Sequence, residues 1–496
     1  MGKRGVWLTF LLLLGLSDRS SMAQDQVIKL NVQWDKVTQI SQTTPTLQVV
    51  VNPLLRRGSP IHDSAFQALR DLQADYIRYV PWRPYPKLGV AELEPPANGK
   101  TSWDFSLIDP MTIDFLEATK GHPVIMNFST IPQWMFKTDK QNSYPADPNQ
   151  VVWNYGQGTE LRDPTGKEVG DYFSRIISWY TLGGFTDEVG KRHESGYHYS
   201  IPYWEVLNEV EFDTPENYTR TYDAVVEAIR RVQPGTKFVG MALALPDDVP
   251  QFIEYFLDHK NHKPGIPLDF ISYHFYVIPD PDESLETQQY TFFARAEGFV
   301  HAVKFIELMR KRLSPETRTT IDEIGAVASD DSEIGKPGHP PIPDSYWSLV
   351  SALFGYVFGE ASRLGIDAVG VSQLVAYPTQ YPSVAMVDWN TGKPNPRFWA
   401  LKLLRDNFGP GDKVVEAKIT DSTYVYALGV ITREGKRRLL LINKRNRIMQ
   451  LSIPGVRGGQ QDYVDQTTAF QPPASQKLTS DTVVLNGFSV ASVTLP

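Results

Sequence analysis

Two glutamates stand at or directly after apolar, strand-like runs of the chain. Residues 203–209 read Tyr-Trp-Glu-Val-Leu-Asn-Glu and end at Glu209, while residues 319–325 carry Glu323. Two carboxylates that flank one bond are what the cleavage of a glycosidic bond requires. One donates a proton to the leaving oxygen, and the other attacks the anomeric carbon or activates water. The alternative is that both glutamates cap helices or pair with nearby arginines.

The elements that must position this pair form a regular alternation. Runs rich in β-branched and aromatic residues are each followed, in most cases, by a stretch whose apolar residues are spaced three and four apart. This alternation predicts an α/β fold, a (β/α)8 TIM barrel with long loops. A doubly wound open sheet is the alternative, but no Gly-rich phosphate motif follows the first strand. The predicted strands are 46–51, 76–80, 123–128, 203–207, 237–242, 268–276, 318–324 and 368–374.

The barrel prediction brings the two glutamates to one place. Reacting groups of such barrels lie at the C-terminal ends of the strands, and the fourth and seventh strands stand across the mouth from each other. Side chains alternate along a strand, so Glu205 and Glu209 share one face, and Ile321 shares a face with Glu323. A carboxylate as deep as Glu205 needs a partner, and Arg78 on the second strand is the candidate.

The pattern of predicted strands and helices changes after the barrel. We assign residues 41–410 to the barrel and residues 411–496 to a C-terminal β-sandwich domain, because several strand-like runs follow there without helical spacing. Within residues 24–40, the alternating run 27–32 is a candidate strand that could join this sandwich. The strands predicted in the sandwich are 424–431, 438–443, 448–453, 482–485 and 488–495.

The first residues resemble a targeting signal. Lys3 and Arg4 precede an apolar run over 6–16, and small residues flank a cleavage point after Ala23. This layout predicts a cleavable signal peptide over 1–23 and a secreted or periplasmic protein, with an uncleaved interfacial anchor as the alternative. Later stretches are too polar to predict a membrane span.

Composition excludes several classes of function. The chain has 496 residues, no cysteine and a formal charge of −8. Without cysteine it has no disulfide scaffold, thiolate nucleophile or thiolate zinc site. A nucleic-acid partner would need a basic face. The histidine pairs His193/His198 and His259/His262 form no convincing metal cluster in the sequence. We therefore expect neither a cofactor nor a metal.

The motifs together resemble a known group of enzymes. Residues 204–209 (Trp-Glu-Val-Leu-Asn-Glu), Glu323, residues 272–276 (Ser-Tyr-His-Phe-Tyr) and residues 383–394 are similar to the clan A retaining glycoside hydrolases. Within the clan the chain most resembles family 39, the β-xylosidase and α-L-iduronidase family. The resemblance implies a glycoside or saccharide substrate and hydrolysis with retention, with Glu209 as the general acid/base and Glu323 as the nucleophile.

The resemblance also implies roles for further residues. Asn208 would bind the sugar 2-hydroxyl, Arg78 would lie near the nucleophile, and His274 and Tyr276 would surround nucleophile and substrate. From the residues alone, Arg78 is as well explained as a structural partner of Glu205, and His274 as a hydrogen-bonded core residue. Among the loop aromatics we select Trp134 as the ring that stacks on sugar; the others are Trp82, Trp153, Tyr155, Tyr377 and Tyr381.

Two departures from the clan pattern affect the substrate prediction. The eighth strand reads Ser372-Gln373-Leu374-Val375 where many members carry a tryptophan, and Asp322 is an unusual acidic neighbour of Glu323. We expect a β-xylosidase-like or related β-glycosidase. One alternative is a uronic-acid glycosidase of the α-L-iduronidase type, which would need extra cations in its pocket, from loop residues such as Arg83, Lys87, Arg162 or Lys191. The other alternative is a non-catalytic carbohydrate-binding barrel.

Overall fold

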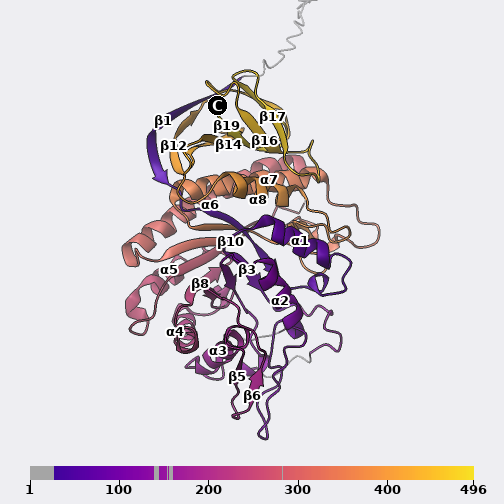
Figure 1. Cartoon of the computed structure of the whole chain (residues 1–496), viewed down its shortest axis with the longest axis vertical. Helices are drawn as coiled ribbons and strands as arrows, with labels where there is room; N and C mark the ends of the chain where they lie inside the picture. Colours follow the sequence, from indigo (N-terminus) through magenta and orange to yellow (C-terminus); the bar gives the residue numbers. More distant parts are fainter. Residues whose placement is uncertain (1–26, 139–143, 154, 156–159, 282) are drawn as a thin grey trace, which may run out of the picture.

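The chain folds into a closed parallel barrel and a mixed β domain (Figure 1). The computed structural model describes residues 27–496 except 139–143, 154, 156–159 and 282, so the predicted signal peptide lies outside the described residues. The eight barrel strands confirm the predicted alternation and each overlaps its predicted run. They are β2 (Thr44–Val50), β3 (Ile77–Val80), β4 (Val124–Met126), β7 (Tyr203–Glu205), β8 (Lys237–Leu243), β9 (Phe270–Val277), β10 (Arg318–Ala326) and β11 (Ala368–Val371).

The helices that surround the barrel carry ordinary start and stop signals. In the fourth of them, the Thr214 hydroxyl caps the first turn by accepting from the Asn217 N–H, Pro215 opens the helix, and Arg230 and Arg231 occupy its last turn. Its apolar face packs on the barrel. The helices are α1 (His62–Leu72), α2 (Asp109–Ala118), α3 (Lys167–Thr181), α4 (Pro215–Val232), α5 (Pro250–Leu257), α6 (Leu285–Leu313), α7 (Asp344–Leu364) and α8 (Pro396–Asn407). None of the described helices is both long and apolar enough to cross a membrane.

The C-terminal domain is a nine-stranded mixed sheet that encloses an apolar core of its own. The strand before the barrel, β1 (Ile28–Ile40), belongs to this sheet, because it pairs antiparallel with β12 and parallel with β15. The sequence did not predict β12, β16 or β17. The other strands are β12 (Lys413–Ile419), β13 (Val425–Ile431), β14 (Arg437–Asn443), β15 (Met449–Ser452), β16 (Gln460–Val464), β17 (Ala474–Lys477), β18 (Thr482–Leu485) and β19 (Val490–Thr494). A short hairpin, β5 (Gly184–Thr186) and β6 (Arg192–Glu194), extends the loop before β7.

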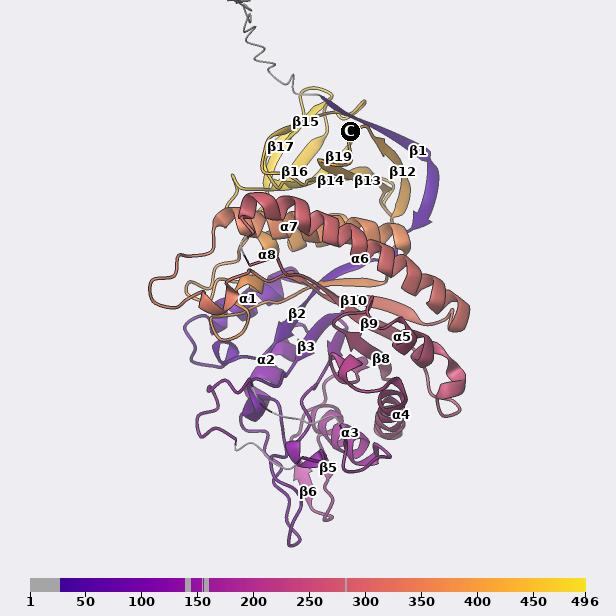
Figure 2. The ribbon, with the colours of Figure 1, turned by 180° about the vertical axis from the view of Figure 1, so that it is seen from behind.

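Helices α7 and α8 lie between this sheet and the barrel in both views (Figures 1 and 2). Two glycines of α7 allow the close approach. A Cβ at Gly355 would come within 2.7 Å of the Ile442 side chain, and one at Gly359 would enter the Tyr426 ring. Arg363 then donates to the Tyr426 hydroxyl at 3.1 Å and to the Ala427 carbonyl at 2.8 Å. The β domain therefore supports the helices behind β10, β11 and β2.

Candidate active site

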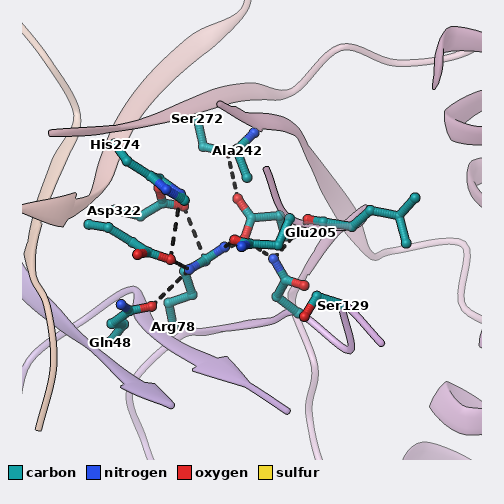
Figure 3. A network of polar contacts seen from close by, with 12 residues as sticks. Gln48, Arg78, Ser129, Glu205, Ala242, Ser272, His274 and Asp322 are labelled. Carbon is teal, nitrogen blue, oxygen red and sulfur yellow. Dashed lines mark hydrogen bonds and ion pairs between the residues drawn. The ribbon is translucent and has the colours of Figure 1, made fainter. Parts of the chain in front are cut away.

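One buried arginine joins the strand ends at the barrel mouth. Arg78 on β3 is completely buried, and its guanidinium donates to Gln48 of β2 at 2.8 Å and to Glu205 of β7. It also donates to Asn208 and to Glu323 of β10. Figure 3 shows Arg78 between Gln48, Asp322 and Glu205. Burial lowers the pKa of Arg78, but the neighbouring Glu205 and Glu323 raise it above its ordinary value, so the side chain stays charged.

Two deep carboxyl groups beside Arg78 differ in ionisation. Burial raises the pKa of Glu205, but the attraction of Arg78 outweighs it and the pKa lies below its ordinary value. Glu205 also accepts from the Ser272 hydroxyl and the Asn127 amide, both at 2.5 Å. At Asp322, burial and the repulsion of Glu205 raise the pKa well above its ordinary value, although Arg78 Nε lies 3.4 Å away. Glu205 is therefore the anion, and Asp322 is neutral.

A bulge in β10 interrupts the strict alternation of side chains that the sequence predicts. Strict alternation places Asp322 on the opposite face from Glu323, yet both side chains contact Arg78. The register of β10 shifts between Ile321 and Glu323 against β9, and again before Ile324 against β11. One extra residue in a strand turns two consecutive side chains toward the same side. Gly370 of β11 makes room for the bulge, because a Cβ there would lie 2.9 Å from the Asp322 carbonyl oxygen.

Glu323 is held as an anion at the edge of the cavity. It is 7% exposed, and it accepts from Arg78 and from the Tyr276 hydroxyl, the latter at 2.6 Å. Burial raises the pKa of Glu323, but attraction to His274 and Arg78 and the Tyr276 hydrogen bond lower it below its ordinary value. Burial and the negative charge of Glu323 raise the pKa of Tyr276 well above its ordinary value, so the phenol remains a donor. This arrangement suits a nucleophile.

Glu209 is the more accessible carboxyl group, and a turn rather than strand parity aims it. The side chain is 27% exposed. β7 ends at Glu205, and both Leu207 and Glu209 adopt left-handed backbone conformations, with φ of 64° and 53°. Such conformations cost about 1–2 kcal/mol each in non-glycine residues. The Asn127 amide stabilises the turn by donating to the Leu207 carbonyl at 2.9 Å. The turn therefore sets the direction of the Glu209 side chain.

The structure brings the two predicted carboxylates together. An oxygen of Glu209, an oxygen of Glu323 and a ring nitrogen of His274 all lie within 4.8 Å of one another. Retaining glycosidases hold their carboxyl groups about 5–5.5 Å apart, whereas inverting enzymes leave room for a water, at about 6.5–9.5 Å. An oxygen–oxygen distance of at most 4.8 Å is shorter than the spacing that leaves room for such a water.

His274 lies between the two carboxylates. Its Nδ1 is 3.5 Å from Glu209, and its Nε2 is 3.5 Å from Glu323 and 3.6 Å from Asp322. Burial lowers the pKa of His274, but Glu323 and Glu209 raise it to about 9. At neutral pH the ring is a cation. Glu209, His274 and Glu323 could hold a metal ion only if His274 lost this proton, and Arg78 already donates to Glu323.

Glu209 stands between two cavities that share one wall. One cavity, of about 310 Å³, is lined by Glu323 and Tyr276, and the other, of about 620 Å³, is lined by Phe136 and Phe212. Both volumes are typical of ligand sites. Because Glu209 lines both, a ligand lying beside it could place one group in each cavity. The shared wall consists of Trp82, Arg83, Asn208 and Glu209.

Trp134 is the predicted site residue that the structure places elsewhere. It is 4% exposed, its indole N–H donates to the Glu92 carbonyl at 2.9 Å, and the Arg162 guanidinium lies 4.4 Å from its ring centre. It lines neither cavity, so its selection as the stacking ring is wrong. Trp82, two residues after β3, lines both cavities instead. Its position just after the end of a strand is the signal by which it could have been selected.

Two polar residues that were not predicted to belong to the site also line it, one on the first barrel strand and one directly after the last. Gln48 of β2 and Ser372, directly after β11, line the cavity beside Glu323 and are hydrogen-bonded to each other at 2.8 Å. Ser372 also contacts the Tyr276 hydroxyl. Gln48 could have been found, because it is a polar residue inside an apolar run. With Tyr381, these residues line one side of the cavity beside Glu323.

We predict unequal costs for neutralising the two deep carboxyl groups. Glu205→Gln removes one of the two ionised partners of the buried Arg78 charge, and we expect the free energy of unfolding to fall by about 3–5 kcal/mol. Asp322→Asn replaces a neutral acid by a neutral amide of the same shape, and we expect a loss of about 1 kcal/mol or less. Denaturant unfolding of the two variants measures both. A larger loss for Asp322→Asn would contradict the assigned ionisation.

We predict that His274 makes stability depend on pH in the alkaline range. Its pKa is about 9 in the folded protein and about 6.5 when unfolded. The stability contributed by its charge is therefore complete below pH ~6.5 and is lost as the pH rises through about 9. The difference in unfolding free energy between the wild type and His274→Gln should shrink between pH 6.5 and 10. A constant or growing difference would show that His274 is neutral.

Solved structures share this fold at low sequence identity. The family 51 arabinofuranosidase from Xanthomonas axonopodis pv. citri aligns with TM-score 0.61 and 14% identity over 95% of this chain and 100% of its own. The family 51 α-L-arabinofuranosidase from Thermotoga petrophila gives 0.60 and 14%, over 95% and 100%. The family 30 endoxylanase from Clostridium papyrosolvens gives 0.54 and 14%, over 94% and 99%. No protein-family model and no curated protein matches the chain. The chain thus shares the fold of these solved structures, a (β/α)8 barrel with an additional β domain.

Proposed function

We propose that the protein is a retaining glycoside hydrolase that cleaves O-glycosidic bonds by double displacement, with Glu323 as nucleophile and Glu209 as acid/base. One observation carries the proposal: oxygens of the two carboxyl groups lie within 4.8 Å of each other beside a cavity. The anionic state of Glu323 and the greater exposure of Glu209 support the assignment of the roles. The shared fold of families 51 and 30 agrees with it.

The proposed reaction has two steps. In the first, a Glu323 oxygen attacks the anomeric carbon while the proton of Glu209 passes to the leaving oxygen, so the glycosidic bond breaks and a glycosyl ester of Glu323 forms. In the second, Glu209 takes a proton from water, the resulting hydroxide attacks the anomeric carbon from the opposite face, and the Glu323 carboxylate leaves. Two inversions at one carbon give a product with the configuration of the substrate.

The neighbouring residues have roles that follow from their contacts. The Asn208 amide oxygen accepts from Arg78, which leaves its NH2 group to donate into the cavities that it lines. A sugar hydroxyl next to the anomeric carbon is the natural acceptor. Arg78 and Tyr276 donate to different oxygens of Glu323 and fix the orientation of its carboxylate. His274 supplies positive charge to both carboxylates without entering the reaction.

The sugar and the family are finer parts of the proposal. The motifs that resemble family 39 favour a β-xylosidase-like or related β-glycosidase, and this assignment rests on the sequence, since the similar structures described above come from families 51 and 30. The secreted or periplasmic location also rests on the sequence of residues 1–23. Hydrolysis of a panel of aryl glycosides of both anomers would identify the sugar.

We predict distinct defects for the two catalytic variants. Glu323→Ala should abolish turnover, and added azide should restore the release of the leaving group while forming a glycosyl azide of inverted configuration, because azide fills the space of the missing carboxylate. Glu209→Ala should slow substrates with poor leaving groups by about 10²–10⁴-fold, and activated aryl glycosides much less. Initial rates on an aryl glycoside series, with NMR of the azide product, measure both effects.

The matched control is Glu254→Ala, which removes an exposed carboxylate of α5 that pairs with Arg312. It should keep full activity, because surface ion pairs contribute little. Full activity of Glu323→Ala or of Glu209→Ala would overturn the proposal. Saccharide binding by the wild type without hydrolysis of any glycoside would instead indicate the non-catalytic binding barrel.

A further inference from the structure

Three neighbouring loops at the barrel mouth each expose a large apolar side chain. Phe212 is 76% exposed, Leu245 is 57% exposed and Ile278 is 55% exposed. Phe212 ends the short helix η4 (Val210–Phe212), which follows Glu209, while Leu245 lies two residues after β8 and Ile278 directly after β9. Exposed apolar side chains that gather in one place commonly mark a binding surface. We call these three residues the apolar arc.

Hydrogen bonds hold the loops of the apolar arc next to each other. The side chain of Glu211, the residue before Phe212, accepts from two backbone N–H groups of the loop after β8, at 2.8 and 3.2 Å; the second is that of Leu245. Leu245 and Ile278 line the cavity beside Glu323, and Phe212 lines the other cavity. The apolar arc therefore runs along the rim of both cavities.

The opposite wall of the cavity beside Glu323 is polar. Gln48 of β2 and the pair Ser372 and Gln373 after β11 line it. In the closed order of the barrel, three strands separate β2 from β8 on either side, and three separate β11 from β7. Amide and hydroxyl groups exchange hydrogen bonds with sugar hydroxyls, whereas the side chains of leucine and isoleucine have no donor or acceptor. The two walls therefore suit two groups of different polarity.

The position of the proton donor decides which group lies on the apolar arc. In the proposed reaction, the sugar under attack lies at Glu323, beside the polar wall. The leaving oxygen takes its proton from Glu209, and η4 follows Glu209 directly in the chain. The leaving group therefore departs beside the turn that leads to Phe212. A second sugar would find neither a ring face nor a hydrogen-bonding group in the Leu245 and Ile278 side chains.

We propose that the bond that is cleaved joins a sugar to an apolar alcohol, and that the apolar arc binds this alcohol. The alcohol is a long alkyl chain or a fused-ring compound, so the substrate is amphiphilic. This inference rests on the proposed function for the identity of the cleaved bond. Complete burial of one methylene group favours binding by about fourfold; an open surface covers about one side of a chain, which corresponds to about twofold per methylene.

The test varies the size of the leaving group while its chemistry stays the same. Methyl, butyl, hexyl and octyl glycosides release primary alcohols of similar acidity. They are prepared with the sugar and anomer that the aryl panel identifies and are assayed below the concentrations at which they form micelles. We expect kcat/KM to rise about twofold per methylene, so that the octyl glycoside exceeds the methyl glycoside by about 100-fold. Glycosides of cyclohexanol and of a steroid alcohol show whether the arc prefers a chain or fused rings.

Two variants reduce the apolar arc and leave the carboxyl groups in place. Phe212→Ser and Leu245→Ser should each lower the ratio of kcat/KM between the octyl and methyl glycosides by about 5–10-fold. The matched controls are Phe305→Ser and Leu308→Ser. These side chains of α6 are 53% and 68% exposed and line neither cavity, so their removal should not change the ratio.

Several results would overturn the inference and leave the proposed hydrolysis intact. One is an equal kcat/KM along the alkyl series, or an octyl-to-methyl ratio that neither Phe212→Ser nor Leu245→Ser lowers. Another is a higher kcat/KM for a disaccharide of the same sugar than for its octyl glycoside. Binding to phosphatidylcholine vesicles, or dimerisation in sedimentation equilibrium, that Phe212→Ser abolishes while the alkyl series stays flat would assign the apolar arc to a membrane or to a second copy of the chain.

A binding measurement separates the inference from the proposed function. Calorimetry measures the affinity of the wild type and of Phe212→Ser for the methyl and octyl glycosides. Affinity that rises with alkyl length and depends on Phe212, in a protein that hydrolyses no glycoside, would overturn the proposed function and support the apolar arc as a site for an apolar alcohol. Equal affinity for both glycosides would overturn the inference whatever the activity.

Discussion

The buried charge of Arg78 is the constraint on which the rest of the site depends. A guanidinium without solvent is tolerated only when ionised and hydrogen-bonding partners surround it. Here the partners come from β2, β7 and β10 and from the turn after β7. Satisfying Arg78 therefore fixes the relative positions of the strand ends, and it fixes the orientation of Asn208 and Glu323 at the same time. The geometry of the candidate site and the stability of the barrel mouth have one common cause.

The charges around Arg78 also balance. Arg78 and His274 are cations, Glu205 and Glu323 are anions, and Asp322 is neutral. In the proposed reaction, esterification removes the charge of Glu323 as Glu209 gives up its proton and becomes an anion. His274 lies 3.5 Å from both carboxylates, so one fixed cation compensates the negative charge before and after this transfer. A preorganised charge of this kind needs no rearrangement during the reaction.

The sequence predicted the parts of the site that follow from strand period and burial. All eight barrel strands were found, because their apolar runs are bounded by loops and helical spacing. The pairing of Arg78 with Glu205 followed from the cost of burying a charge. The bulge at Asp322 could not be predicted, since strict alternation has no signal for an extra residue. The left-handed turn that aims Glu209 was missed for the same reason. Trp134 was chosen by its neighbourhood in the chain, and only tertiary packing showed that its ring is buried.

The β domain, too, was predicted only in part. Five of its strands, β13, β14, β15, β18 and β19, were predicted from their strand-like runs, and the strand ahead of the barrel was recognised as a candidate partner. β16 and β17 were not predicted because polar residues dominate both strands. β16 is placed by its pairing with β19, and β17 by its pairing with β16. Which face of α7 the domain covers depends on Gly355 and Gly359, whose missing side chains admit Ile442 and Tyr426. Such complementarity between distant segments has no local signature.

The most direct test of the account is to identify the residue that becomes glycosylated. The protein is treated with the 2-deoxy-2-fluoro derivative of its best aryl glycoside, which slows the second step more than the first, and its peptides are examined by mass spectrometry. The account predicts one added glycosyl group, located on Glu323. A label on Glu209, or turnover by a mechanism in which no peptide is ever labelled, would contradict it.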